Sequence, residues 1–524
     1  MNILPLIAAI PLAFSSGNTP ANEPATTLEE NFFAWSLQSL ELPSNPVDDF
    51  QVRLVLDEVF DTELLLTKYS VRSQNFVAYE QREDGKLYAI ETPEIRTYRG
   101  VIAGIPGSTV SASLRKTGLH ARIDLGDGSP VRMVQPLSDF DGSAVSDVHV
   151  IYNTADMVPD DKWVMAESLI PPNYQSDPVS PFNGGNHGGS HAPGSGNNQH
   201  VSPGSLNGNQ RADKTVELAV DADYKYFQSN GNSSNNTIAD IEDVINDVEA
   251  IYQNDVSICY DITTVIVRTS SGSDPYTSNN SSTLLNQFRA EWNSNQGSVQ
   301  RDFAQLFTGR SISGSVIGIA WLGVVCNSGY GYSMVQSKYT NNMSRRVSLS
   351  AHELGHNWNA DHCCSSCSGC GSCHIMCPCN GGCSGNVSKF GSSSISSINS
   401  HKNSRNCLDS GCNGGGGGGG GSLTITNPSP GYAGVVNSLT VAGGTANGSG
   451  TLYYSATTGF ASTPCTSVYV GLNNPKVAGT VNFDSSGNGS FSKTVPARAA
   501  GRTIYIQFVD TTGCELSNMV TEVF

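Results

Sequence analysis

Three histidines and one glutamate within eleven residues have the types and the spacing to hold and use a metal ion. His352 and His356 are four residues apart, so on a helix they share one face and can bind the same ion. Glu353 lies beside them, where it can act on a metal-bound water. His362 is out of reach of the same helix, and Asn359 suits the left-handed turn that must end it. Three neutral imidazoles with one open position predict a catalytic zinc site; the alternative is a surface helix with scattered histidines.

The stretch from His352 to His362, HELGHNWNADH, resembles the zinc signature HExxHxxGxxH of the metzincin endopeptidases, in their adamalysin (reprolysin, ADAM-like) branch. The sequence HIMCP around Met376 is similar to that branch's Met-turn, which implies that Met376 is an apolar floor below the metal ligands. Asn359 stands where the family has glycine, and Cys363 where adamalysins have aspartate. No tyrosine follows Met376, so a fifth, tyrosine ligand is not expected.

The resemblance implies an endopeptidase that uses Zn²⁺ to hydrolyse peptide bonds in proteins. Zinc held by three histidines lowers the pKa of its bound water to about 7 and polarises the scissile carbonyl. We expect Glu353 to take the proton of that water and to deliver it to the leaving amine. A non-catalytic secreted adhesin or binding protein built on the same scaffold is the alternative.

The elements that position these residues are expected between residues 213 and 412. Apolar periodicity predicts strands at 216–220, 260–267 and 315–322, and helices at 238–252, 284–292, 301–307 and 348–358. This alternation indicates a mixed α/β (α+β) arrangement. The resemblance implies a metzincin-like catalytic domain with a mixed five-stranded sheet, whose edge strand at 315–322 would pair with an extended substrate.

The 14 cysteines all lie at or after Cys259, and eight of them lie within residues 363–383. An even number in an exported chain predicts disulfides. The run at 367–377 also fits the spacing of a bacterial 4Fe–4S protein, and a second, structural zinc is a further alternative. Cys465 and Cys514 are the only cysteines of the C-terminal part and would pair with each other.

The adamalysin resemblance implies two further features. Cys326 would pair with Cys407. A calcium site would take the carboxylates of Glu217 and Asp302 and the backbone carbonyl of Cys407, because oxygen ligands suit Ca²⁺. Ser410 stands where the family has asparagine, and ordinary surface carboxylates are the alternative.

Composition shifts divide the chain into six parts. We expect a secretory signal peptide, a β-rich prodomain similar to that of reprolysin zymogens, a linker rich in Gly, Asn and His that holds the maturation cleavage, the catalytic domain, a glycine tether, and an accessory β-sandwich of immunoglobulin-like size. These parts correspond to residues 1–17, 18–182, 183–212, 213–412, 413–421 and 422–524.

Net charge and hydropathy indicate which classes of binding partner the chain is not expected to have. The formal net charge of −17 argues against nucleic acid and anionic membranes as partners. Beyond the short apolar run at 3–14, no stretch is apolar enough to span a bilayer. We expect the chain to be secreted and monomeric, and the family resemblance implies that it acts on proteins or peptides. The expected prodomain has no cysteine, so a thiolate cannot hold the expected zymogen latent.

Overall fold

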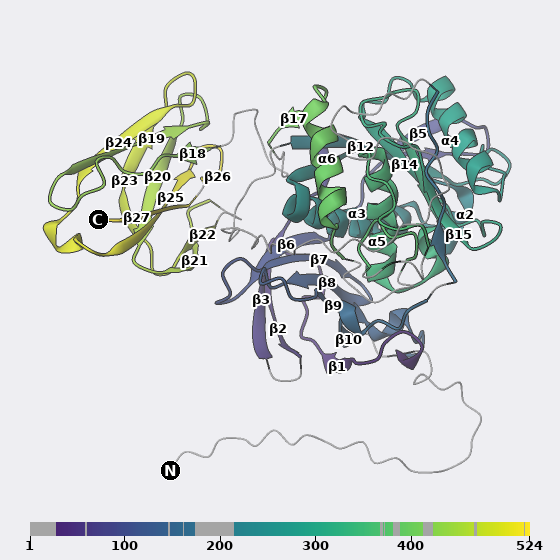
Figure 1. The fold of residues 1–524 in the computed structure, drawn as a ribbon, viewed down its shortest axis with the longest axis horizontal. Coiled ribbons are helices and arrows are strands. Elements are labelled where there is room, and N and C mark those ends of the chain that lie inside the picture. Colours follow the sequence, from purple (N-terminus) through teal and green to yellow (C-terminus); the bar gives the residue numbers. More distant parts are fainter. Residues whose placement is uncertain are drawn as a thin grey trace, which may run out of the picture.

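The computed structural model describes residues 28–57, 60–144, 147–160, 162–172, 214–366, 370, 373–380, 388–411, 423–465, 469–517 and 519–524. Figure 1 shows three regions in order of sequence: an N-terminal region (28–172), a central region (214–411) and a C-terminal region (423–524). The expected signal peptide, the linker at 183–212 and the glycine tether lie outside the described residues. Among the described helices, none is long and apolar enough to cross a bilayer.

The N-terminal region forms an eight-stranded antiparallel sheet with the strand order β1-β10-β9-β8-β7-β6-β3-β2. In β2 and β3 buried side chains alternate with more exposed ones, as in an antiparallel sheet with one face exposed to solvent. Nearly every side chain of β7 and β8 is buried, because these strands are covered on both faces. The strands are β1 (Ser36–Ser39), β2 (Asp49–Leu56), β3 (Phe60–Lys68), β6 (Thr97–Ile102), β7 (Thr109–Arg115), β8 (Gly118–Asp124), β9 (Arg132–Pro136) and β10 (Val148–Asn153).

The central sheet has nine strands rather than the five expected, and the additional strands explain the difference. Five strands run in the order β15-β16-β14-β12-β13, with β15 antiparallel to β16 and the other pairs parallel. The N-terminal region adds β4 and β5 beyond β13, and β11 beyond β15, while β17 pairs with one end of β12. The strands are β4 (Arg72–Gln81), β5 (Leu87–Ile90), β11 (Val164–Met165), β12 (Lys214–Ala222), β13 (Ile258–Arg268), β14 (Phe303–Phe307), β15 (Val316–Ala320), β16 (Tyr332–Val335) and β17 (Asp409–Ser410).

Helices cover both faces of the central sheet (Figure 1). They are α2 (Tyr224–Ser229), α3 (Ser234–Val256), α4 (Ser281–Asn295), α5 (Met343–Asn357) and α6 (Ser392–Ser404). Neighbouring strand residues alternate between two cores: Val265 and Val267 pack with α3 and α5, whereas Ile266 packs with α4. This period of two lets one sheet serve two helical layers.

Two expectations about local structure were wrong. Residues 303–307 form strand β14 rather than part of a helix, and all five of its side chains are buried. A strand buried on both faces shows no alternation, so its short apolar run cannot be told from a helix by pattern. Helix α3 begins at Ser234, four residues before the predicted start at 238, because the Ser233 hydroxyl caps it by accepting a hydrogen bond from the Asn236 backbone N–H. The remaining predicted strands and helices are confirmed to within a few residues.

The C-terminal region is all β, as expected. Its larger sheets have the orders β18-β19-β24 and β23-β20-β25-β26, with β27 beside β25, and β21 pairs with β22. Side chains of both larger sheets share one apolar core, and Cys465 is bonded to Cys514 as expected. The immunoglobulin-like topology stays a prediction. The strands are β18 (Thr424–Ile425), β19 (Val436–Ala442), β20 (Ser449–Ser455), β21 (Thr458–Ser462), β22 (Tyr469–Leu472), β23 (Lys476–Asn482), β24 (Gly489–Thr494), β25 (Thr503–Asp510), β26 (Glu515–Leu516) and β27 (Val520–Val523).

Candidate metal centre

The three histidines of the signature converge at the end of α5. The Nε2 atom of His352 lies 3.0 Å from Nε2 of His356 and 3.1 Å from Nε2 of His362. The first two rings project from one face of α5, which ends at Asn357. Asn359 then takes a φ of 70°, the left-handed conformation expected for it, and the chain turns back to bring His362 beside the helix.

Backbone carbonyls fix the orientation of two of the rings. The Nδ1 atom of His352 lies 2.6 Å from the carbonyl oxygen of Ile375, and Nδ1 of His356 lies 2.7 Å from that of Ala360. A carbonyl can only accept, so each Nδ1 carries the proton and each Nε2 offers a lone pair. Burial, with the neighbouring imidazoles, lowers the pKa of His352 well below its usual value and that of His356 to about 3. Both rings are therefore neutral, as metal ligation requires.

Glu353 is buried on α5, and neither carboxylate oxygen has a hydrogen-bond partner within the described residues. Burial raises the pKa of this carboxyl well above its usual value. Strand β15 passes directly over it: a Cβ atom built on Gly318 would lie 2.3 Å from Oε1 of Glu353. A buried carboxyl without a partner is costly for folding, and this cost is characteristic of a group kept for a reaction.

Met376 lies below the histidines. Its side chain is fully buried, and a Cβ atom on Gly355 would come within 2.4 Å of its sulfur, so α5 meets the Met376 turn at a glycine. Cys363, which directly follows the third histidine, forms a disulfide with Cys377. The Cys363 N–H also donates to the Met376 carbonyl, over 2.8 Å. The residue that departs from the adamalysin pattern thus fixes the His362 loop to the methionine turn.

The donor set fits Zn²⁺. Nitrogen ligands lie about 2.0–2.1 Å from zinc, which places tetrahedral ligand atoms about 3.3–3.4 Å apart. The two Nε2 separations, 3.0 and 3.1 Å, need to open by only a few tenths of an ångström to meet that spacing. Three nitrogen donors leave the fourth position of a tetrahedral site for water or substrate.

Comparison with known proteins agrees with this geometry. Residues 212–438 match the family described as Metallo-peptidase family M12, in its reprolysin group. Through this region, which is less than half of the chain, the protein is similar to the reprolysin metallopeptidases. The match contains all three histidines, Glu353 and Met376.

The individual relatives are partial matches. Disintegrin and metalloproteinase domain-containing protein 19 of Mus musculus is 33% identical over 164 residues, which are 30% of this chain and 18% of that protein. Zinc metalloproteinase-disintegrin-like BmMP of Bungarus multicinctus is 38% identical over 73 residues, 14% of this chain and 12% of that protein. The chain thus spans under a fifth of the length of these relatives. Metalloproteinase-II from Bacteroides fragilis has a similar structure at 11% identity and a TM-score of 0.35, over 71% of this chain and 93% of its own.

A segment of the N-terminal region, Trp163–Leu169, covers the edge of the metallopeptidase sheet next to Glu353. We call it the covering segment. Its strand β11 pairs in parallel with β15, and the Ala166 N–H donates to the Gly318 carbonyl over 3.0 Å. On its other side, the Met165 N–H donates to the Pro378 carbonyl over 3.0 Å. Glu167 Oε1 lies 3.6 Å from Nδ1 of His362. The sequence analysis missed this segment, because its two paired residues give no strand pattern.

The cysteine cluster is explained by disulfides. Cys364 is bonded to Cys370, Cys363 to Cys377, and Cys373 is also in a disulfide. Cys367 lies outside the described residues. Since these bonds occupy three of the four thiolates of the proposed run, the iron–sulfur interpretation fails. Cys326 is bonded to Cys407, the pairing that the resemblance implied.

The carboxylates expected to bind calcium lie together. The Glu217 backbone N–H donates to Oδ2 of Asp302 over 2.9 Å. Burial, together with the charges of Glu217 and Asp409, raises the pKa of Asp302 to about 7. Asp409, on β17, is an acidic neighbour that the sequence analysis did not include. Asp302 is buried, Glu217 is half-buried and Asp409 is exposed. A buried acid with a raised pKa beside other carboxylates is a chemical environment that a divalent cation would stabilise.

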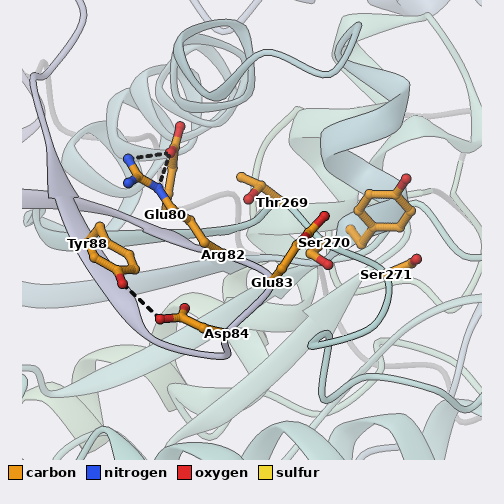
Figure 2. Close-up of a pocket in the computed structure, with 9 residues that line it drawn as sticks. Glu80, Arg82, Glu83, Asp84, Tyr88, Thr269, Ser270 and Ser271 are labelled. Carbon is orange, nitrogen blue, oxygen red and sulfur yellow. Dashed lines mark hydrogen bonds and ion pairs between the residues drawn. The ribbon is translucent and has the colours of Figure 1, made fainter.

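A cavity of about 720 Å³ lies where the β4–β5 hairpin packs against the end of β13, away from the histidines (Figure 2). Four of the residues that line it are paired within the hairpin itself. Arg82 contacts Glu80 at 3.3 Å, and the Tyr88 hydroxyl donates to Asp84 over 2.8 Å. These pairs stabilise the hairpin, and none of the residues that line the cavity belongs to the candidate metal centre.

Proposed function

We propose that the chain is a zinc-dependent endopeptidase that hydrolyses peptide bonds in proteins. The convergence of three Nε2 atoms beside a buried, unpartnered Glu353 is the observation that supports it most. His352, His356 and His362 would hold Zn²⁺, and Met376 would support them from below. Zinc at such a site supplies a water with a pKa near 7 and polarises a carbonyl.

Each residue of the site would then have its own role in peptide hydrolysis. Glu353 takes a proton from the attacking water through its carboxylate, and its raised pKa makes it able to return that proton to the leaving amine. The carbonyls of Ile375 and Ala360 keep two imidazoles in the tautomer that binds metal. Strand β15, with Gly318 over Glu353, would hold an extended peptide through the backbone groups that the covering segment occupies in the uncut chain.

Substitution of Glu353 tests the proposal. Glu353→Gln keeps the size of the side chain but cannot accept a proton. We expect metal analysis to find about one zinc per chain in both proteins, and casein hydrolysis to fall by roughly 10²–10⁴-fold in the variant. Wild-type protein that retains zinc but digests neither casein nor a peptide library, with or without chelator, would instead support a binding protein on a metallopeptidase scaffold.

We also infer that the chain is made as a zymogen and exported. The covering segment occupies backbone groups of β15 that a substrate strand would need, and it provides a means of latency without a cysteine. Four disulfides with both partners described fit an oxidising compartment. Removal of the N-terminal region would then free β15.

Calcium at Glu217 and Asp302 is a further part of the proposal. Asp409 adds a carboxylate that could compensate for Ser410, and Cys407 is held nearby by its disulfide to Cys326. The carboxylates would bind the ion through oxygen, as Ca²⁺ prefers. The site would tie strand β12 to the end of the central region.

A further inference from the structure

Helix α3 carries two different faces. One face is apolar and packs on the central sheet, as its sequence predicts. The other face is acidic, and a solvated surface is the usual expectation for such a face. In the structure the acidic side chains are buried, with no more than about 4% of their surface exposed. They are Asp240, Glu242, Asp243, Asp247 and Glu249.

Basic and hydroxyl side chains of the N-terminal region bury this acidic face. Arg115 on β7 binds Asp240 over 2.8 Å and also contacts Asp243. Arg99 on β6 binds Glu249 over 2.9 Å. The set is completed by Arg72 with Glu242 at 2.9 Å, Tyr69 with Glu249 at 2.8 Å, and Ser111 with Asp247 at 2.5 Å.

The pairing is specific to this contact. Among the described residues, Glu242, Asp243 and Glu249 form ion pairs only with arginines of the N-terminal region. Asp240 differs, because Arg346 and Lys338 of the central region also contact it. If the N-terminal region left, three carboxylates of α3 would lose their cations. Removing one partner of a buried ion pair leaves the other charge uncompensated, and this is strongly unfavourable.

We propose that the acidic face of α3 is a docking surface for the arginine-bearing strands β4, β6 and β7 of the N-terminal region, which stays bound there as a separate chain once the connection is cut. The surface lies on a different element from the histidines, so it is distinct from the contact of the covering segment with β15. Cleavage in the linker alone then leaves the two parts associated, and the covering segment stays in place. The inference about latency rests on the proposed function, whereas the docking itself does not.

The test is to cut the full-length chain in place. A recognition site for a sequence-specific protease is introduced within residues 183–212, the folded protein is cut, and the products are separated by gel filtration. We expect the two fragments to elute together at physiological salt. Fragments of the wild-type sequence that elute separately would overturn the proposal.

Charge variants identify the surface. Arg72→Glu places a carboxylate against Glu242, and it should weaken the association of the cut fragments by roughly 100-fold or more. The exchange Arg72→Glu with Glu242→Arg should restore most of the affinity. Arg53→Glu is the control, because Arg53 lies on strand β2 of the same N-terminal region but pairs with Asp61 in solvent. It should leave the association unchanged.

Two further measurements distinguish a failure of docking from misfolding of a variant and from a failure of the proposed function. Thermal unfolding of each uncut variant shows whether it is folded before it is cut. Equal association of the wild type, Arg72→Glu and the exchanged pair would show that α3 is not the docking surface. Peptide hydrolysis is measured in parallel: if no sample is active, the proposed endopeptidase function fails, while co-elution still reports on docking.

Discussion

At the scale of single residues, the candidate metal centre depends on two glycines, because a larger residue would not fit at either position. Gly355 lets α5 lie against the sulfur of Met376, and Gly318 lets β15 lie against Glu353. Both contacts are closer than any Cβ atom would allow. The histidine spacing therefore describes only part of the site, and the glycines determine how closely the surrounding elements approach it.

Gly355→Ala tests the close approach at the methionine. Alanine gains about 1 kcal/mol of helix propensity, but its methyl group would meet the Met376 sulfur and cost about 1–3 kcal/mol. We expect a net loss of stability and faster loss of zinc to a chelator, measured by thermal unfolding and a colorimetric zinc assay. Gly142→Ala, in a position with open space around it, is the control. If the alanine variant keeps zinc as long as the wild type, the Met376 side chain can move away from α5 without loosening the metal ligands.

Asp247 on α3 should make the stability of the folded protein depend on pH. Burial raises its pKa to about 6, although Ser111 donates a hydrogen bond to it. A raised acid pKa destabilises the folded state progressively from about pH 4 to 6 and fully above pH 6. Asp247→Asn should therefore stabilise the protein at pH 7.5 by up to about 3 kcal/mol and have little effect near pH 4.

Urea unfolding of wild type and Asp247→Asn at both pH values measures this difference. Asp243→Asn is the comparison, because Asp243 has an arginine partner and its loss should destabilise the protein at pH 7.5. Equal effects of the two substitutions at pH 7.5 would contradict the assignment of the penalty to Asp247.

At the scale of elements, the covering segment is the feature with the clearest consequence. Ala166→Pro removes the N–H that donates to Gly318, and it should release the segment from β15. We expect the uncut chain to gain peptidase activity several-fold and the amides of β15 to exchange faster with deuterium. Ile170→Pro, at an exposed position just beyond the segment, is the control. Unchanged exchange in the Ala166 variant would show that the segment is held by side chains rather than by the backbone pairing.

The elements also show what sequence patterns can and cannot predict. Helix α5, its left-handed end at Asn359 and the Cys326–Cys407 pair were predictable, because spacing and family resemblance are local or directly aligned. Strands β4 and β11 were not assigned to the central sheet, since alternation identifies a strand but not its neighbour. The burial of the acidic face of α3 was not predictable either, because it depends on the arginines of a different region.

At the scale of the whole molecule, the two disulfides with the longest sequence separation among the described residues each lie within one region. Cys326–Cys407 closes a loop with a sequence separation of 81 residues in the central region, whereas Cys465–Cys514, with a separation of 49, lies within the C-terminal region. On loop-closure entropy, each should contribute about 4 kcal/mol. Replacing both cysteines of a pair by alanine should therefore lower the unfolding temperature of one region only.

Differential scanning calorimetry of the two double variants would show this. We expect the Cys465/Cys514 double alanine variant to leave the transition of the central region in place, and the Cys326/Cys407 variant to shift it downwards. A common shift of all transitions in both variants would mean that the regions unfold as one cooperative unit.

The sheet that the N-terminal and central regions share has a practical consequence. Strand β13 is eleven residues long and buried throughout; β12 pairs with one of its edges and β4 with the other. A chain expressed from residue 214 onwards would leave the second edge of that long strand unpaired, and other copies could pair with it to form insoluble aggregates. Recombinant work on this protein should therefore begin with the intact chain and cut it after folding.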